Sequence, residues 1–134
     1  MQTTLIRLLF AVSGLYDFII GFVFLVLGPQ LFDAAKIPHP NHWAFVQFGA
    51  LLLVIFGTMF LTIAYQPFAN RNLIPFGMLL KVSYCGLAAY WWASTDIPWL
   101  FKPFAVIDAV MLIAFIWAYF ALRGPAAPLA AGGK

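Results

Sequence analysis

The sequence predicts an all-α integral membrane protein, a four-helix up-down bundle with both termini in the cytoplasm. Three observations predict this fold. Of the 134 residues, 65% are hydrophobic and only 8% are charged, whereas charged residues make up about 25% of a typical soluble domain. Four apolar segments are each long enough to cross the hydrocarbon core. The connections between them are short, which favours antiparallel neighbours.

The same composition excludes several classes of protein. A disordered chain is excluded because disordered chains contain few hydrophobic residues, whereas this sequence is 65% hydrophobic. A nucleic-acid partner is not expected, because the seven Lys and Arg residues, which give a net charge of +3, form no basic cluster. The single cysteine, Cys85, excludes an internal disulfide. No hydrolase, P-loop or dinucleotide motif occurs, so no catalytic residue is predicted.

The four segments follow one another with clear stops. The first ends at Gly28-Pro29 and the second at Gln66-Pro67, and Pro75 lies in the first turn of the third, where a missing N–H costs little. Backbone groups in lipid must be satisfied internally, so each segment is predicted to be a helix. The predicted spans cover about 5–27, 43–65, 74–93 and 99–122.

The remaining residues form connections and a tail. Residues 1–124 are predicted to form one transmembrane domain, and residues 125–134 a flexible C-terminal tail rich in Ala, Gly and Pro. The longest connection, 28–42, contains the stretch 31–37, which is predicted to form one or two helical turns at the membrane interface.

The charged residues outside the spans predict the orientation. On the positive-inside rule, the side with the more strongly positive connections is cytoplasmic. One side carries Arg7, Arg71, Arg123 and Lys134. The other carries Lys36 and Lys102, offset by Asp33 and Asp96. Both termini are therefore expected on the cytoplasmic side of a plasma membrane, with the lipid bilayer surrounding the four spans.

Three ionisable residues fall inside the predicted spans: Asp17, Lys81 and Asp108. Each costs roughly 2.5–3.5 kcal/mol near the centre of a membrane helix, so they are expected to face the bundle and find partners. At 1.5 Å per residue, Asp17 lies about 18 Å and Asp108 about 21 Å from the cytoplasmic end. Lys81 lies about 10 Å from that end, and its long stem can extend toward the acids.

Glycine spacing predicts which helix faces meet. Gly14, Gly21 and Gly28 recur every seven residues, and Asp17 lies on their stripe. Gly49 and Gly57 form a stripe on the second span. Small residues let membrane helices approach closely, so these five glycines are predicted to pack helices together.

The predicted bundle interior contains a group of polar side chains. It contains Asp17, Lys81, Tyr84 and Asp108, with Tyr16 and Ser83 nearby. Two interpretations stay open. These groups either neutralise one another and fix the helix register, or they carry a proton or bind a polar ligand group. Two acids and one base need a further proton or cation for neutrality.

Two other groups are weaker candidates for binding. His39 and His42 have a spacing that can bind a metal, but no Cys or Glu lies near them, and ordinary interfacial histidines are the alternative. No cofactor is predicted, although lipid or a quinone is possible. A quinone site would lie among aromatic residues, with packing at the membrane interface as the alternative. These aromatic residues are Phe45, Phe48, Trp91 and Trp92.

Several short motifs together resemble the DoxX-like small bacterial four-helix membrane proteins. They are Gly14-Leu15-Tyr16-Asp17 with Gly21, Leu27-Gly28-Pro29, the glycines at 49 and 57, Lys81 four residues after Gly77, and Asp108. The resemblance covers most of residues 5–122 and implies a bacterial inner-membrane protein. Some members are linked to quinone-coupled redox complexes, but the Arg- and Glu-bearing signatures of the group are not evident here.

The chain is also similar to small multidrug transporters, which are four-span proteins with an essential acid in the first span. Asp17 would take that place. That family uses Glu at this position, prefers shorter loops and has a weaker charge bias.

Three functions follow as hypotheses. The first is an accessory or assembly subunit of a larger membrane complex, whose partners are other membrane subunits or copies of itself. The second is a proton-coupled small-molecule transporter or binder that uses Asp17 and Asp108. The third is a quinone-associated redox component.

Overall fold

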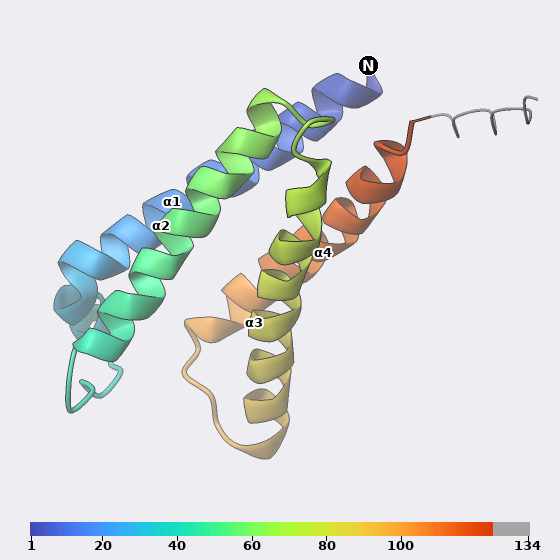
Figure 1. The fold of residues 1–134 in the computed structure, drawn as a ribbon. Coiled ribbons are helices and arrows are strands. Elements are labelled where there is room, and N and C mark those ends of the chain that lie inside the picture. Colours follow the sequence, from blue (N-terminus) through green and yellow to red (C-terminus); the bar gives the residue numbers. More distant parts are fainter. Residues whose placement is uncertain (125–134) are drawn as a thin grey trace, which may run out of the picture.

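The computed structural model describes residues 1–124; the predicted flexible tail, 125–134, lies outside this part of the chain. Four long helices are α1 (Gln2–Ala35), α2 (Ala44–Tyr65), α3 (Ile74–Ser94) and α4 (Phe101–Ala121) (Figure 1). A short 3₁₀ helix, η1 (Arg71–Leu73), precedes α3. All four long helices are apolar and long enough to cross a membrane. Within residues 1–124 no strand occurs, so the all-α prediction is confirmed.

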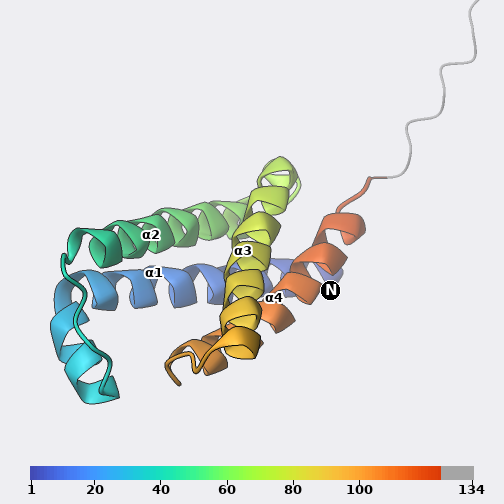
Figure 2. The same cartoon turned by 90° about the horizontal axis from the view of Figure 1, so that it is seen from below.

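The helices form two pairs, and the pairs diverge. α1 packs along α2, and α3 packs along α4, whereas the two pairs contact each other much less. Figure 1 shows the pairs together where α2 leads into α3 and diverging toward the opposite end, where Trp99 Nε1 still donates to the carbonyl of Ala35 at 3.3 Å. Seen from below, α3 and α4 cross the direction of α1 and α2 (Figure 2). The molecule is therefore a splayed bundle with a single region of four-helix contact.

The hydrophobic core lies in that region of contact. Phe10 of α1 stacks on Phe115 of α4, with ring centroids 4.6 Å apart, and Phe60 of α2 meets Phe115 edge-on at 5.0 Å. Gly77 of α3 makes room for these rings, since a Cβ there would lie 2.5 Å from Phe60 Cε1. The buried core residues are Ile6, Phe10, Phe60, Ile63, Ile74, Phe115, Ala118 and Leu122.

Three of the predicted packing glycines bring α1 and α2 into backbone contact. A Cβ on Gly14 would lie 2.8 Å from the carbonyl oxygen of Gly57, and one on Gly57 would lie 2.6 Å from the backbone nitrogen of Phe18. A Cβ on Gly21 would lie 2.5 Å from the carbonyl oxygen of Ala50. Gly28 has more room, and a Cβ there would come within 3.2 Å of the Trp43 ring.

Within residues 1–124, the packing prediction for Gly49 is wrong. A Cβ at this position would meet no atom within 4 Å. Its neighbour Ala50 is buried instead and faces Gly21. Ala50 lies seven residues before Gly57, which keeps both on one helix face, whereas Gly49 is rotated about 100° away from it.

The predicted end of the first span at Gly28-Pro29 coincides with a kink, after which α1 continues to Ala35. The helix bends at Leu27, whose backbone leaves the helical region (φ −114°, ψ 19°). Pro29 then lies in the first turn after the bend, where its missing N–H breaks no helical hydrogen bond. Figure 2 shows the bend near the end of α1. The helical turns predicted within 31–37 are the last turns of this helix.

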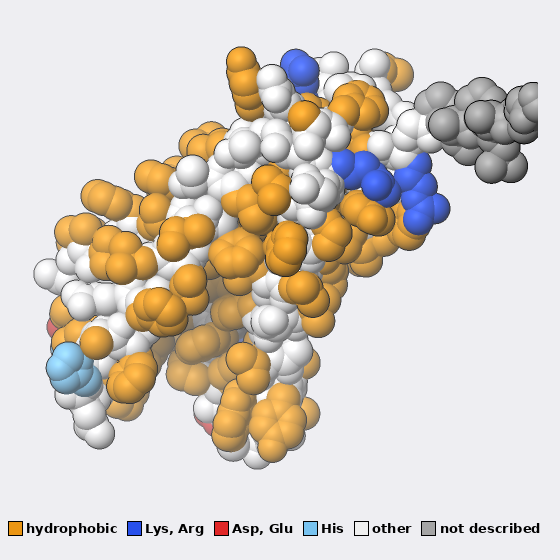
Figure 3. Space-filling model, in the orientation of Figure 1, with side chains coloured by type: hydrophobic (Ala, Val, Ile, Leu, Met, Phe, Trp, Pro, Cys, Tyr) orange, Lys and Arg blue, Asp and Glu red, His pale blue; other side chains and the backbone are white. Residues whose placement is uncertain are grey.

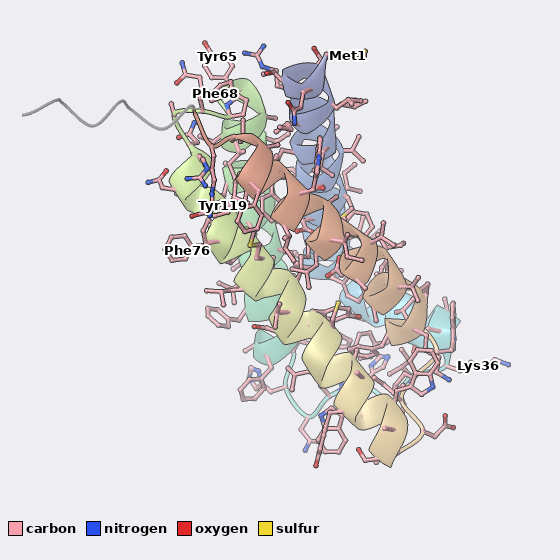
Figure 4. All side chains as sticks on the ribbon, turned by 90° about the vertical axis from the view of Figure 1, so that its right-hand side faces the viewer. Met1, Lys36, Tyr65, Phe68, Phe76 and Tyr119 are labelled. Atoms are coloured by element: carbon pink, nitrogen blue, oxygen red, sulfur yellow. The ribbon has the colours of Figure 1, made fainter. Side chains whose placement is uncertain are left out.

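α1 stops at a left-handed residue. Lys36 has φ 56°, and the N–H of Ile37 bonds back to the carbonyl of Phe32 at 2.8 Å. This hydrogen bond satisfies a carbonyl at the helix end. Figure 4 shows Lys36 and Met1 at opposite ends of the molecule, with Tyr65 and Phe68 near the Met1 end.

The backbone contact at Gly57 predicts a selective effect on stability. Gly57→Leu should destabilise the protein by about 1–3 kcal/mol, because the added side chain forces α1 away from α2. Gly49→Leu on the same helix is the matched control and should leave stability unchanged. Thermal unfolding in detergent, followed by fluorescence size-exclusion chromatography, measures both. Equal losses in the two variants would contradict the assigned contact.

Candidate membrane-embedded site

A buried three-residue ion cluster joins the two helix pairs. The Nζ atom of Lys81 donates to both carboxylate oxygens of Asp17, at 2.9 Å each, and to Oδ1 of Asp108, also at 2.9 Å. The exposed fraction of the side chain is 1% for Lys81, 2% for Asp17 and 10% for Asp108. All three ionisable residues therefore face the interior, as predicted, and they contact one another directly.

The local sequence explains why these side chains meet. Asp17 lies on α1 between Gly14 and Gly21, on the face that packs closely against α2. Lys81 lies one turn after Gly77 on α3, so the tight packing at Gly77 directs the lysine inward. Its four-carbon stem carries the ammonium group to both acids. The Nζ atom also lies 5.6 Å from the centroid of the Tyr16 ring.

The two acids are held differently. Asp17 accepts a hydrogen bond on each of its two oxygens, whereas Asp108 accepts from Lys81 through Oδ1 alone. Asp108 is also the more exposed of the two. Asp17 is therefore the tighter partner of the lysine, and Asp108 keeps one oxygen available to a further group.

A cavity of about 180 Å³ borders the cluster and is contacted by all four helices. Its walls are mainly aliphatic and aromatic, with the two acids and two tyrosines as the polar groups. Figure 3 shows the face between the helix pairs hollowed and lined by hydrophobic side chains. The cavity is lined by Tyr16, Asp17, Ile20, Phe24, Leu53, Leu80, Tyr84, Leu100, Phe101, Phe104 and Asp108.

The two tyrosines of the cavity differ in their hydrogen bonding. The Tyr84 hydroxyl donates to the carbonyl of Phe101 at 3.3 Å. The hydroxyl of Tyr16 is buried and has no partner among the described residues. A buried polar atom without a partner costs about 1–3 kcal/mol. Tyr16 therefore offers an unused hydrogen-bonding group at a cavity wall.

The prediction that Ser83 lies near this cluster is wrong. Ser83 is exposed, and its hydroxyl donates to the carbonyl of Leu79, one turn back on the same helix, at 2.7 Å. Sequence reasoning missed Phe104, which lies four residues before Asp108 and shares its helix face. That spacing could have predicted that Phe104 lies beside Asp108 on the inward face of the helix.

The two histidines make local contacts. His39 Nε2 donates to Asp33 Oδ1 at 2.7 Å, and His42 Nδ1 accepts from the backbone N–H of Ala44 at 3.1 Å. In residues 1–124, no group of three His, Cys, Asp or Glu side chains is arranged to hold a metal ion. Both histidines thus belong to the connection between α1 and α2.

The aromatic residues considered for a quinone lie at the surface of the chain. Phe45, Phe48, Trp91 and Trp92 are all exposed. Of these four, Trp91 lines a cavity between the end of α3 and the start of α4, and none lines the cavity beside the ion cluster. Among the described residues, the four rings therefore share neither of these two cavities.

No protein-family model, curated protein or solved structure matches this chain. The resemblance to DoxX-like proteins therefore stays a prediction.

The shared lysine predicts strong coupling within the cluster. Lys81→Met should destabilise the protein by about 3–5 kcal/mol, because two buried carboxylates lose the one cation that pairs with them among the described residues. The double variant Lys81→Met/Asp17→Asn should recover part of this loss, since one carboxylate is removed as well. Thermal unfolding in detergent gives the ranking. Lys102→Met, outside the cluster, is the control, and a Lys81→Met effect no larger than this control would refute the assignment.

Proposed function

We propose that this protein binds a small amphipathic amine inside the membrane and exchanges it for a proton held at Asp108. The observation that carries the proposal is the position of the ion cluster. A mainly apolar cavity borders a cluster with one more acid than base. Such a site suits a ligand with an apolar body and one positive charge.

The charge balance supports exchange of the amine for a proton. With all three groups ionised, the cluster carries a net charge of −1 in a region of low dielectric. A proton on Asp108 neutralises it when the cavity has no ligand. An ammonium group beside Asp108 neutralises it equally well, so the proton leaves when the amine binds. The site thus holds either a proton or the ammonium group, and binding of one releases the other without a conformational change.

The cavity walls supply the remaining contacts. The Tyr16 hydroxyl, which lacks a partner in the described residues, is available to the ligand's polar end. The Phe101 and Phe104 rings line the same space. Aromatic faces stabilise organic cations, by about 0.5–2 kcal/mol per contact. Together with the Asp108 carboxylate they give the ligand a polar end and an apolar end.

We propose that the protein resides as a multi-pass protein in the bacterial inner membrane, in up-down topology with both termini cytoplasmic. The positive-inside rule supports this orientation. Lys and Arg side chains gather at the end of the molecule where α4 stops (Figure 3). In this orientation the hollow between the helix pairs (Figure 3) opens toward the outer side, where the 36–43 and 95–100 connections lie.

An accessory or assembly subunit is the second candidate function. It is favoured by Gly49 of α2 and Gly86 of α3, where an added Cβ would meet nothing within 4 Å. Outward-facing small residues on membrane helices are typical of contacts with another helix. Isolation in mild detergent tests this role: a partner should co-purify with the native protein and be lost in Gly86→Leu. A purely monomeric native protein would contradict it.

The amine and proton exchange makes a direct prediction. Phenethylamine should bind to the purified protein in weakly buffered detergent and release about one proton per molecule bound, because it displaces the proton on Asp108. A pH-indicator dye measures the release, and isothermal titration calorimetry measures the binding. The neutral analogue 2-phenylethanol, of almost the same size, should release none.

Variants of the site sharpen this test. Asp108→Asn and Asp17→Asn should each abolish proton release, because one acid then matches the single lysine. Tyr16→Phe should weaken binding by about two- to tenfold, the usual loss for one neutral hydrogen bond. Asp33→Asn, an exposed acid outside the cluster, is the matched control. Proton release that survives in Asp108→Asn would contradict the proposed function.

A further inference from the structure

A second, larger cavity lies beside the central one, between the end of α3 and the start of α4. Its volume is about 580 Å³. Its lining combines aromatic and aliphatic side chains with a threonine and an aspartate from the connection 95–100. We call it the vestibule, and it is lined by Tyr84, Leu87, Ala88, Trp91, Thr95, Asp96, Ile97, Pro98 and Phe101.

The vestibule and the central cavity share two wall residues. Tyr84 and Phe101 line both spaces. Their rings stack at a centroid distance of 6.2 Å with an interplanar angle of 16°. The Tyr84 hydroxyl also donates to the Phe101 carbonyl at 3.3 Å. This ring pair therefore separates the vestibule from the ion cluster.

The partition between the cavities is held by weak interactions. A single neutral hydrogen bond fixes the Tyr84 hydroxyl, and its length lies beyond the usual 2.5–3.0 Å for a hydroxyl donor. Phe101 is the first residue of α4 and is itself exposed. A rotation of the Tyr84 side chain would join the two spaces at the cost of one weak hydrogen bond and a ring contact.

Charge favours the vestibule over the apolar hollow as the route for an amine. Asp96 lines the vestibule, is exposed, and forms no salt bridge with any described residue. The nearby Lys102 ammonium lies over the Trp92 ring, 5.0 Å from its centroid, and lines neither cavity. An ammonium group that crossed the hydrophobic hollow would lose its hydration without a compensating charge.

From this geometry we infer that the vestibule is an outer subsite for the amine and that the Tyr84–Phe101 ring pair gates its passage to the central cavity. The inference rests on the proposed function and names the route to the same site. In the vestibule, the ammonium group faces Asp96 and the apolar body contacts Trp91. The ligand reaches Asp108 when Tyr84 moves aside.

Binding kinetics of phenethylamine, followed by stopped-flow detection of the released proton, test this inference. Tyr84→Phe keeps the ring but removes the hydrogen bond to Phe101, so association and dissociation should both become about fivefold faster. Weakening a gate lowers the barrier to ligand passage equally in both directions. The dissociation constant should therefore change much less than the two rates. Tyr90→Phe, an exposed tyrosine on the same helix that lines neither cavity, is the matched control.

Blocking the vestibule gives the opposite effect. In a Cys85→Ser background, Thr95→Cys carries a thiol in the vestibule wall. Modification with a bulky methanethiosulfonate should slow association at least tenfold. Ser94→Cys, the exposed neighbour that does not line the vestibule, should show no change after the same treatment.

The outcomes separate the two proposals. Unchanged rates in Tyr84→Phe and in the blocked Thr95→Cys protein, with equilibrium binding intact, would overturn the vestibule route and leave the proposed function standing. Failure of the unmodified protein to bind phenethylamine or release a proton would overturn the proposed function itself, and the vestibule route with it.

Discussion

The ammonium group of Lys81, shared by two carboxylates, is the interaction on which the rest of this structure depends. Asp17 comes from the α1–α2 pair, whereas Lys81 and Asp108 come from the α3–α4 pair. An unpaired charge at this depth would cost several kcal/mol, so each pair needs the other to bury its ionisable residues. The cluster thus fixes how the two pairs are rotated about their axes, which apolar contacts alone specify poorly.

The same interaction explains why a cavity forms where it does. On one side of the cluster, phenylalanine rings around Gly77 fill the space between the pairs. On the other side, the pairs diverge, and the side chains of Phe24, Leu53 and Phe104 line an open space instead of meeting. The polar groups therefore lie at the junction of a packed half and a hollow half. That position allows a charged cluster to be buried and yet reach a ligand, which is the basis of the proposed exchange of an amine for a proton.

Much of this arrangement follows from the sequence, and the rest depends on rotations that a sequence does not specify. The cost of charge in lipid was enough to predict that Asp17, Lys81 and Asp108 face inward. Heptad spacing was enough to predict that Gly14 and Gly21 pack against another helix. The same prediction failed for Gly49, because its neighbour Ala50 faces α1 and one residue along a helix is a rotation of 100°. Pro29 did not end α1 because the backbone bends at Leu27 before it. The cavity itself depends on the crossing of the two helix pairs, for which hydrophobic runs carry no signal.

Infrared difference spectroscopy of the protonated carboxyl band tests the central claim most directly. The account predicts such a band in the ligand-free protein at neutral pH, because two buried acids share one lysine. The band should disappear when phenethylamine binds, be missing in Asp17→Asn and Asp108→Asn, and grow in Lys81→Met. A ligand-free protein without this band, or a band that phenethylamine leaves unchanged, would contradict the account.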